Sequence, residues 1–131
     1  MVKQPQFSEE LRIFIKDRIQ TVLRLEVLLL LHDHQSRSFN AGEIADELGF
    51  DIEPMQDQLS ALEAIGLAVQ STNGESRYRY QPADATLEAK VEQLAAAYST
   101  QRVPILSVIL ADASERTRLF AEAFKIIRRN D

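Results

Sequence analysis

The segment after Gly66 constrains the fold most, because the apolar pattern changes there from helical spacing to alternation. In residues 67–80, LAVQSTNGESRYRY, apolar and polar side chains alternate on both sides of Asn73-Gly74. An Asn-Gly pair favours a two-residue type I′ turn, since both central residues of that turn need positive φ. The segment therefore predicts a β-hairpin centred on this dipeptide.

The turn position also predicts the register of the two strands, because side chains on paired strands alternate between two faces. One face should be apolar and belong to the core, with both tyrosines on it, and the other should be basic. The predicted pairs are Leu67 with Tyr80 and Val69 with Tyr78 on the apolar face, and Ala68 with Arg79 and Gln70 with Arg77 on the basic face.

Two short helices are predicted directly before the hairpin. Asn40 followed by Glu43 is a capping-box pattern that starts the first helix, and Gly49 provides the left-handed residue that ends it. Asp51 is then expected to cap a second helix that ends at Gly66. The inward-facing residues would be Ile44, Ala45 and Leu48 in the first helix and Met55, Leu59 and Leu62 in the second.

Helical spacing also flanks this central part of the chain. Residues 9–34 have a helical apolar stripe that becomes apolar all round in LEVLLLL, which predicts a buried central helix; either one long helix or two with a break near Thr21 fits the pattern. Beyond Pro82 two further helical stripes are separated by a junction at residues 102–104. The stripes contain Leu87, Val91, Leu94, Ala95 and Tyr98, then Ile105 to Leu110, and finally Leu119, Phe120, Ala123, Phe124 and Ile127.

The order of these elements resembles the winged helix-turn-helix domains of bacterial transcriptional regulators of the MarR and ArsR type. The resemblance is carried by IADELG at residues 44–49, by LSALEAIGLAV at residues 59–69 and by the hairpin that ends in YRY. It covers residues 20–82. We therefore expect one mainly α domain over residues 1–131, a winged unit with a small β-hairpin wing, and flanking helices in 1–19 and 83–131 that form a homodimer.

The resemblance implies a binding site and a function. In such regulators the second helix of the pair, here residues 52–65, enters the DNA major groove while the wing contacts the flanking backbone. The expected function is that of a DNA-binding transcriptional regulator. By position, the residues expected to contact double-stranded DNA, or another partner, are Glu53, Gln56, Asp57, Ser60, Arg77 and Arg79, with Pro54 and Ala61 also outward.

Charge favours a second interpretation. The chain has a formal net charge of −5, and residues 38–82 hold eight acids against two bases, a net charge of −6. DNA affinity depends largely on Lys and Arg that neutralise phosphates, so further bases on the same face would be needed. The alternative is a protein-interaction module whose acidic helix binds a basic protein partner. The bases that could help, if they lie on the same face, are Arg12, Lys16, Arg18, Arg24 and Arg37.

Enzymatic chemistry has little support in the sequence. The chain has no cysteine and only two histidines, and His32 and His34 point about 200° apart if both lie on a helix. We expect no catalytic residues, no metal site and no cofactor, with the histidines ending a buried helix. No apolar run approaches the ~20 residues of a membrane span, so no membrane association and a cytoplasmic location are expected.

Overall fold

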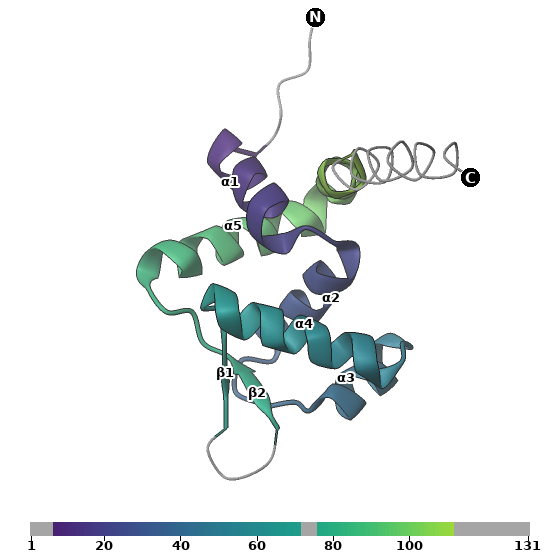
Figure 1. Ribbon diagram of the computed structural model, residues 1–131. Coiled ribbons are helices and arrows are strands. Elements are labelled where there is room, and N and C mark those ends of the chain that lie inside the picture. Colours follow the sequence, from purple (N-terminus) through teal and green to yellow (C-terminus); the bar gives the residue numbers. More distant parts are fainter. Residues whose placement is uncertain (1–6, 72–75, 112–131) are drawn as a thin grey trace, which may run out of the picture.

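The computed structural model describes residues 7–71 and 76–111, and this part of the chain is mainly helical with a small two-stranded antiparallel sheet (Figure 1). Helix α4 packs against α2, α3 and β1, while α2 also contacts β2, and α1 contacts α5. The core lies between these helices and one face of the sheet. The elements are α1 (Glu9–Phe14), the π-helix η1 (Ile15–Ile19), α2 (Val22–Asp33), α3 (Ala41–Leu48), α4 (Ile52–Ile65), β1 (Ala68–Gln70), β2 (Tyr78–Tyr80) and α5 (Ala85–Thr100).

The pair α3 and α4 has the ends that the sequence predicts. The Asn40 side chain accepts a hydrogen bond from the Glu43 amide at 2.8 Å, and the Glu43 carboxylate accepts one from the Asn40 amide at 3.1 Å, which is a complete capping box. Gly49 and Gly66 follow the two helices with φ of 77° and 96°. Asp51 occupies the N-cap position of α4, but its side chain makes no capping hydrogen bond, contrary to expectation.

The predicted inner stripes of both helices are largely confirmed. Met55, Leu59 and Leu62 are fully buried along α4. Ile44 and Ala45 are buried in α3, and Leu48 packs against the core while partly exposed. The helix α2, which holds LEVLLLL, supplies four buried residues and is the central helix of the fold, as predicted.

The predicted hairpin exists, but its register is shifted by one residue. Ala68 pairs with Tyr80, Val69 with Arg79 and Gln70 with Tyr78, so none of the four predicted pairs forms. The Ser71 amide still donates to the Arg77 carbonyl at 2.7 Å, which makes the connection longer than the two residues of a type I′ turn. The turn residues Asn73 and Gly74 themselves lie outside the described residues.

Packing explains the observed register. Both tyrosines are buried, at 3% and 5% exposure, as predicted, but the residue beside them on the inner face is the small Ala68 instead of Val69. Val69 is 37% exposed, whereas Leu67, which precedes β1, is fully buried. A two-residue turn would place the bulkier Val69 between the rings, so ring packing overrides the local turn preference.

A residue outside the hairpin fixes β2 from its other edge. The amide and carbonyl of Phe39 exchange hydrogen bonds with those of Tyr78, both at 2.8 Å. Phe39 is itself buried at 1% exposure. The short segment between α2 and α3 thus forms an antiparallel bridge to β2 and attaches the hairpin to the helices.

The first helical region is broken, which decides between the two alternatives that the sequence left open. The π-helix η1 ends at Ile19, Gln20 has a φ of 70°, and Thr21 caps α2 by accepting a hydrogen bond from the Arg24 amide at 3.0 Å. The Thr21 amide donates to the Ile19 carbonyl at 2.8 Å, so the chain reverses in a tight turn with Gln20 at its centre.

The predicted break after α5 exists, but it lies at Gln101 and not at residues 102–104, which form the first turn of the next helical segment, where a proline is tolerated. The helix α5 and a helical segment at Arg102–Ala111 meet at an angle of 113°, with Gln101 between them. Ile105 and Ile109 are buried and pack the second segment against the core.

No single helix in the described part of the chain is long and apolar enough to cross a membrane. The predicted stripe from Leu119 to Ile127 and the basic pair Arg128-Arg129 lie outside the described residues.

Candidate interaction surface

Three of the four α4 residues predicted to contact a partner are exposed to solvent. Glu53, Asp57 and Ser60 are exposed on the outer side of the helix. Gln56 is only partly exposed, since its amide Nε2 donates to the Tyr78 hydroxyl at 3.2 Å and lies 3.5 Å from the Ser60 hydroxyl. Gln56 therefore joins α4 to β2, and a partner would have to compete with Tyr78 for its amide.

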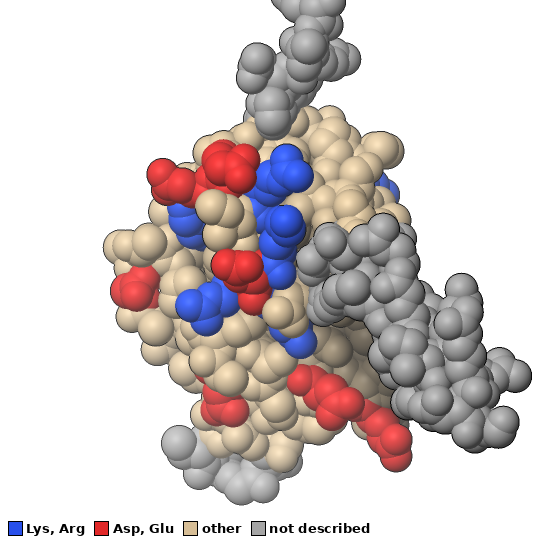
Figure 2. Space-filling model, turned by 45° about the horizontal axis from the view of Figure 1, so that its top comes forward, with Lys and Arg blue, Asp and Glu red and all other residues tan. Residues whose placement is uncertain are grey.

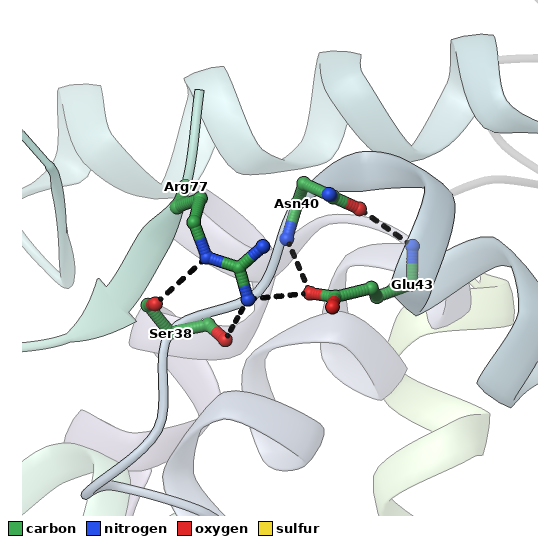
Figure 3. A network of polar contacts seen from close by, with 4 residues as sticks. All are labelled: Ser38, Asn40, Glu43 and Arg77. Atoms are coloured by element: carbon green, nitrogen blue, oxygen red, sulfur yellow. Dashed lines mark hydrogen bonds and ion pairs between the residues drawn. The ribbon is translucent and has the colours of Figure 1, made fainter. Parts of the chain in front are cut away.

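Arg77 is a structural clamp (Figure 3). Its guanidinium donates to the Ser38 hydroxyl and the Ser38 carbonyl, both at 3.0 Å, and to the Glu43 carboxylate at 2.8 Å. Only 24% of the Arg77 side chain is exposed. The pKa of Glu43 is lowered, first by the hydrogen bond from the Asn40 amide and then by the positive charge of Arg77. Arg77 thus ties β2 to the start of α3.

Arg79 lies on the opposite face of the hairpin from the core and is exposed. Its Nη2 donates to the Gln81 side chain at 3.1 Å, a weak exposed contact that leaves its charge open to a ligand. Arg79 and Arg77 also line a polar hollow with Ser38, Gln70 and Ser71. Of the two wing arginines in the prediction, Arg79 is the one whose charge is uncompensated by a carboxylate among the described residues.

The five other bases considered for this face lie elsewhere or make other contacts. Arg12 belongs to α1 and Lys16 and Arg18 to η1, at the end of the molecule opposite the hairpin (Figure 1). The Arg24 guanidinium donates to the Gln58 side chain at 2.9 Å and to the Arg18 carbonyl at 3.0 Å. Arg37 lies over the Phe39 ring, 4.3 Å from its centroid. No basic surface extends from the hairpin along α4 in the described part of the chain.

The helix pair is instead uniformly acidic. Residues 41–66 hold seven acids and no base. Figure 2 shows basic groups in the upper and middle parts of the face drawn, interspersed with acids, while the lower part, toward the hairpin loop, shows acidic groups only. Six of the seven acids are exposed and have no ion-pair partner among the described residues: Asp46, Glu47, Asp51, Glu53, Asp57 and Glu63.

The turn between α3 and α4 adds an apolar feature that the sequence interpretation did not include in the site. Phe50 and Ile52 are 50% and 58% exposed, and they line a shallow groove with Ala45, Asp46, Asp51, Glu53 and Pro54. The available signal was the pair of large apolar residues directly after the stop at Gly49, outside both helical stripes. We call this group, Asp46 and Phe50 to Glu53, the turn surface.

The histidines end α2, as expected, and they do not meet. The His32 ring is 2.9 Å from the Glu92 carboxylate of α5 through Nε2 and 3.1 Å from Asp33 through Nδ1. Burial opposes its protonation, but these two carboxylates outweigh it and raise the pKa of His32. The ring contacts Tyr80 edge-on, and burial, then the nearby Glu92, raises the pKa of Tyr80 to about 12. Within the described ranges no three His, Asp or Glu side chains are placed to hold a metal ion.

In comparisons with known proteins, no protein-family model, no curated protein and no solved structure matches this chain.

Proposed function

We propose that this chain is a non-enzymatic winged-helix module that binds a basic segment of a partner protein through the acidic surface of α3 and α4. One observation carries the proposal: residues 41–66 combine seven acids with no base, and six of those acids are exposed and unpaired among the described residues. Such a surface attracts a basic partner through complementary potential and repels a polyanion.

The arrangement of elements supports the winged-helix part of this proposal. Two short helices are joined by a glycine turn, and a hairpin follows the second helix directly. The bridge between Phe39 and Tyr78 and the clamp of Arg77 on Ser38 fix the hairpin against the helix pair. A wing held this firmly would present α4 in one orientation to a partner.

The test reverses the charge of α4 without changing the core. Glu53→Lys with Asp57→Lys should abolish co-purification of the partner that the wild-type chain captures from lysate. Asp17→Lys, an exposed reversal on η1, is the matched control and should leave capture unchanged. Capture that persists in the double variant would refute the proposal.

DNA binding is the second candidate, and it is favoured by the exposure of Ser60 on α4 and of Arg79 on β2. A dimer would present two copies of each, at the spacing of successive major grooves. Fluorescence polarisation with labelled duplex at about 50 mM salt separates the candidates, because phosphate contacts are strongest at low salt. Binding at micromolar protein that is lost in Arg79→Ala would favour DNA over the protein partner.

A homodimer through the flanking helices is also part of the proposal. Ile13 on α1 and Val103 and Leu110 on the segment Arg102–Ala111 are 49%, 71% and 55% exposed, and a second copy of the chain could cover them. Light scattering coupled to gel filtration would measure the mass. Val103→Glu with Leu110→Glu should shift a dimer to a monomer, and a wild-type monomer would remove this part of the proposal.

A further inference from the structure

The turn surface combines exposed apolar side chains with three carboxylates along one shallow groove. Phe50 and Ile52 expose about half of their surface, and the exposed acids Asp46, Asp51 and Glu53 lie beside them. Asp51 stands at the N-cap of α4 without capping it, so its carboxylate is free to bind a cation. A ligand that fits this surface must offer apolar side chains together with several positive charges.

The chain contains a segment of that composition. Residues 116–129, RTRLFAEAFKIIRR, hold five bases and one acid, and their apolar residues recur at the spacing of one helix face. The segment lies outside the described residues and follows the described helical segment Arg102–Ala111 in the sequence. Residues 116–129 are thus complementary in charge to the acidic stretch 41–66.

We propose that residues 116–129 bind in cis to the turn surface, with their apolar side chains on Phe50 and Ile52 and their bases beside Asp46, Asp51 and Glu53. Twenty residues follow Ala111 in the sequence. As a helix residues 116–129 span ~21 Å, and residues 112–115 add up to ~14 Å when extended, together about the diameter of a domain of this size, so the surface is within reach. A tethered ligand acts at an effective concentration in the millimolar range, which favours the contact within one chain over a contact between chains.

This inference rests on the proposed function and assigns its regulation. A basic partner and the chain's own basic segment would compete for the same carboxylates, so the segment is an autoinhibitor. Partner binding then requires displacement of the segment and exposes Phe50 and Ile52 together with the acids.

Zero-length carbodiimide cross-linking of the full chain tests the contact, because the reagent joins a lysine amine to a carboxylate that touches it. Lys125 is the only lysine in the basic segment. We expect cross-links from Lys125 to Asp46, Asp51 or Glu53 in the monomer band. Lys90 and Glu10, whose side chains are 2.9 Å apart, provide an internal positive control. Lys125→Arg keeps the charge but cannot form the amide, so the cross-link should disappear.

The outcomes are distinct. Cross-links of Lys125 elsewhere, only between two chains, or not at all while Lys90 joins Glu10, would overturn the cis contact. Charge reversal of Lys125, Arg128 and Arg129 to Glu should strengthen binding of a synthetic peptide of residues 112–131 to the full chain at least tenfold; unchanged affinity would overturn autoinhibition. If partner capture still depends on Glu53 and Asp57 in either case, the proposed function stands without this regulation.

Discussion

The two ends of the central helix α2 are anchored in different ways. At its start the backbone is irregular, with a π-helix, a residue at positive φ and Thr21 as cap, and the Arg24 guanidinium joins this junction to α4. At its end none of the described residues has a positive φ, and His32 joins α2 to α5 while Arg77 holds Ser38, which follows the helix. The start of α2 depends on Arg24, which is permanently charged, next to a strained turn. The end of α2 includes His32, which can gain or lose a proton.

The difference shows where the fold stores strain. A residue other than glycine at positive φ costs of order 1–3 kcal/mol and persists only when its surroundings hold it. Gln20 is such a residue, and its side chain is held at both ends: its Nε2 donates to the Asp17 carbonyl, and its Oε1 accepts from Arg24. The start of α2 should therefore be more sensitive to the loss of one arginine than the end.

The largest expected effect is that of Arg24→Ala. The variant loses the hydrogen bonds to the Gln58 side chain and the Arg18 carbonyl, which together connect η1 to α4. We expect a loss of about 2 kcal/mol in the free energy of unfolding, measured by urea denaturation. Arg12→Ala, an exposed arginine on α1, should change stability by less than about 0.5 kcal/mol. Equal losses of stability in the two variants would show that the hydrogen bonds of Arg24 between η1 and α4 do not stabilise the fold.

Arg77→Ala should have the next largest effect. It removes the clamp on Ser38 and Glu43, but these groups are partly exposed, so water replaces part of the lost interaction. We expect a loss of about 1.5 kcal/mol, against less than about 0.5 kcal/mol for Arg79→Ala, two residues further on in β2. Hydrogen exchange should become faster at the Phe39 and Tyr78 amides in Arg77→Ala alone. If exchange at these amides becomes equally fast in Arg77→Ala and Arg79→Ala, Arg77 does not hold β2 against Ser38 and Glu43.

Local signals predicted the region between α3 and β1 well. The capping box at Asn40 and the stops at Gly49 and Gly66 act within a few residues, and packing agrees with them. The same approach failed at the hairpin register, because the choice of Ala68 as the inner residue depends on two buried tyrosine rings and on Phe39, which lies far away in the sequence.

The candidate site was predictable in position but not in chemistry. The outward placement of Glu53, Asp57 and Ser60 follows from helical periodicity. Arg77 was predicted to contact a partner, and its actual role depends on Ser38 and Glu43, which no spacing rule brings to it. At the η1–α2 junction the residue with positive φ is a glutamine and not a glycine, so no signal in the sequence indicated the strain at Gln20.

Removing the glycine that ends α3 and introducing a glycine at the turn before α2 should change the free energy of unfolding in opposite directions. Gly49→Ala puts a Cβ into open space but at a φ of 77°, which should cost about 1 kcal/mol. Gln20→Gly relieves a φ of 70°, and although it gives up an exposed hydrogen bond to the Asp17 carbonyl and a part-buried one from Arg24, it should stabilise the fold by about 0.5 kcal/mol. Thermal unfolding of both variants measures whether each is less or more stable than the wild type. A destabilised Gln20→Gly would mean that the side-chain contacts outweigh the strain.

The smallest expected effect is confined to acidic and neutral pH and concerns His32. Its neighbours Asp33 and Glu92 raise its pKa above the ordinary 6.5, against the effect of burial. The protonated ring therefore stabilises the fold fully below pH 6.5, and this contribution is lost as the pH rises through the raised pKa. It should be modest, because the Asp33 and Glu92 side chains are 65% and 54% exposed.

Unfolding free energies of His32→Gln and the wild type, measured from about pH 5 to 8, should converge as the pH rises, since only the wild type carries the titrating group. The deficit of Arg24→Ala should stay constant over the same range, because arginine remains charged throughout. If the His32→Gln deficit is also constant, the ring acts through its edge-on contact with Tyr80, 5.3 Å between centroids, and both ends of α2 are independent of pH.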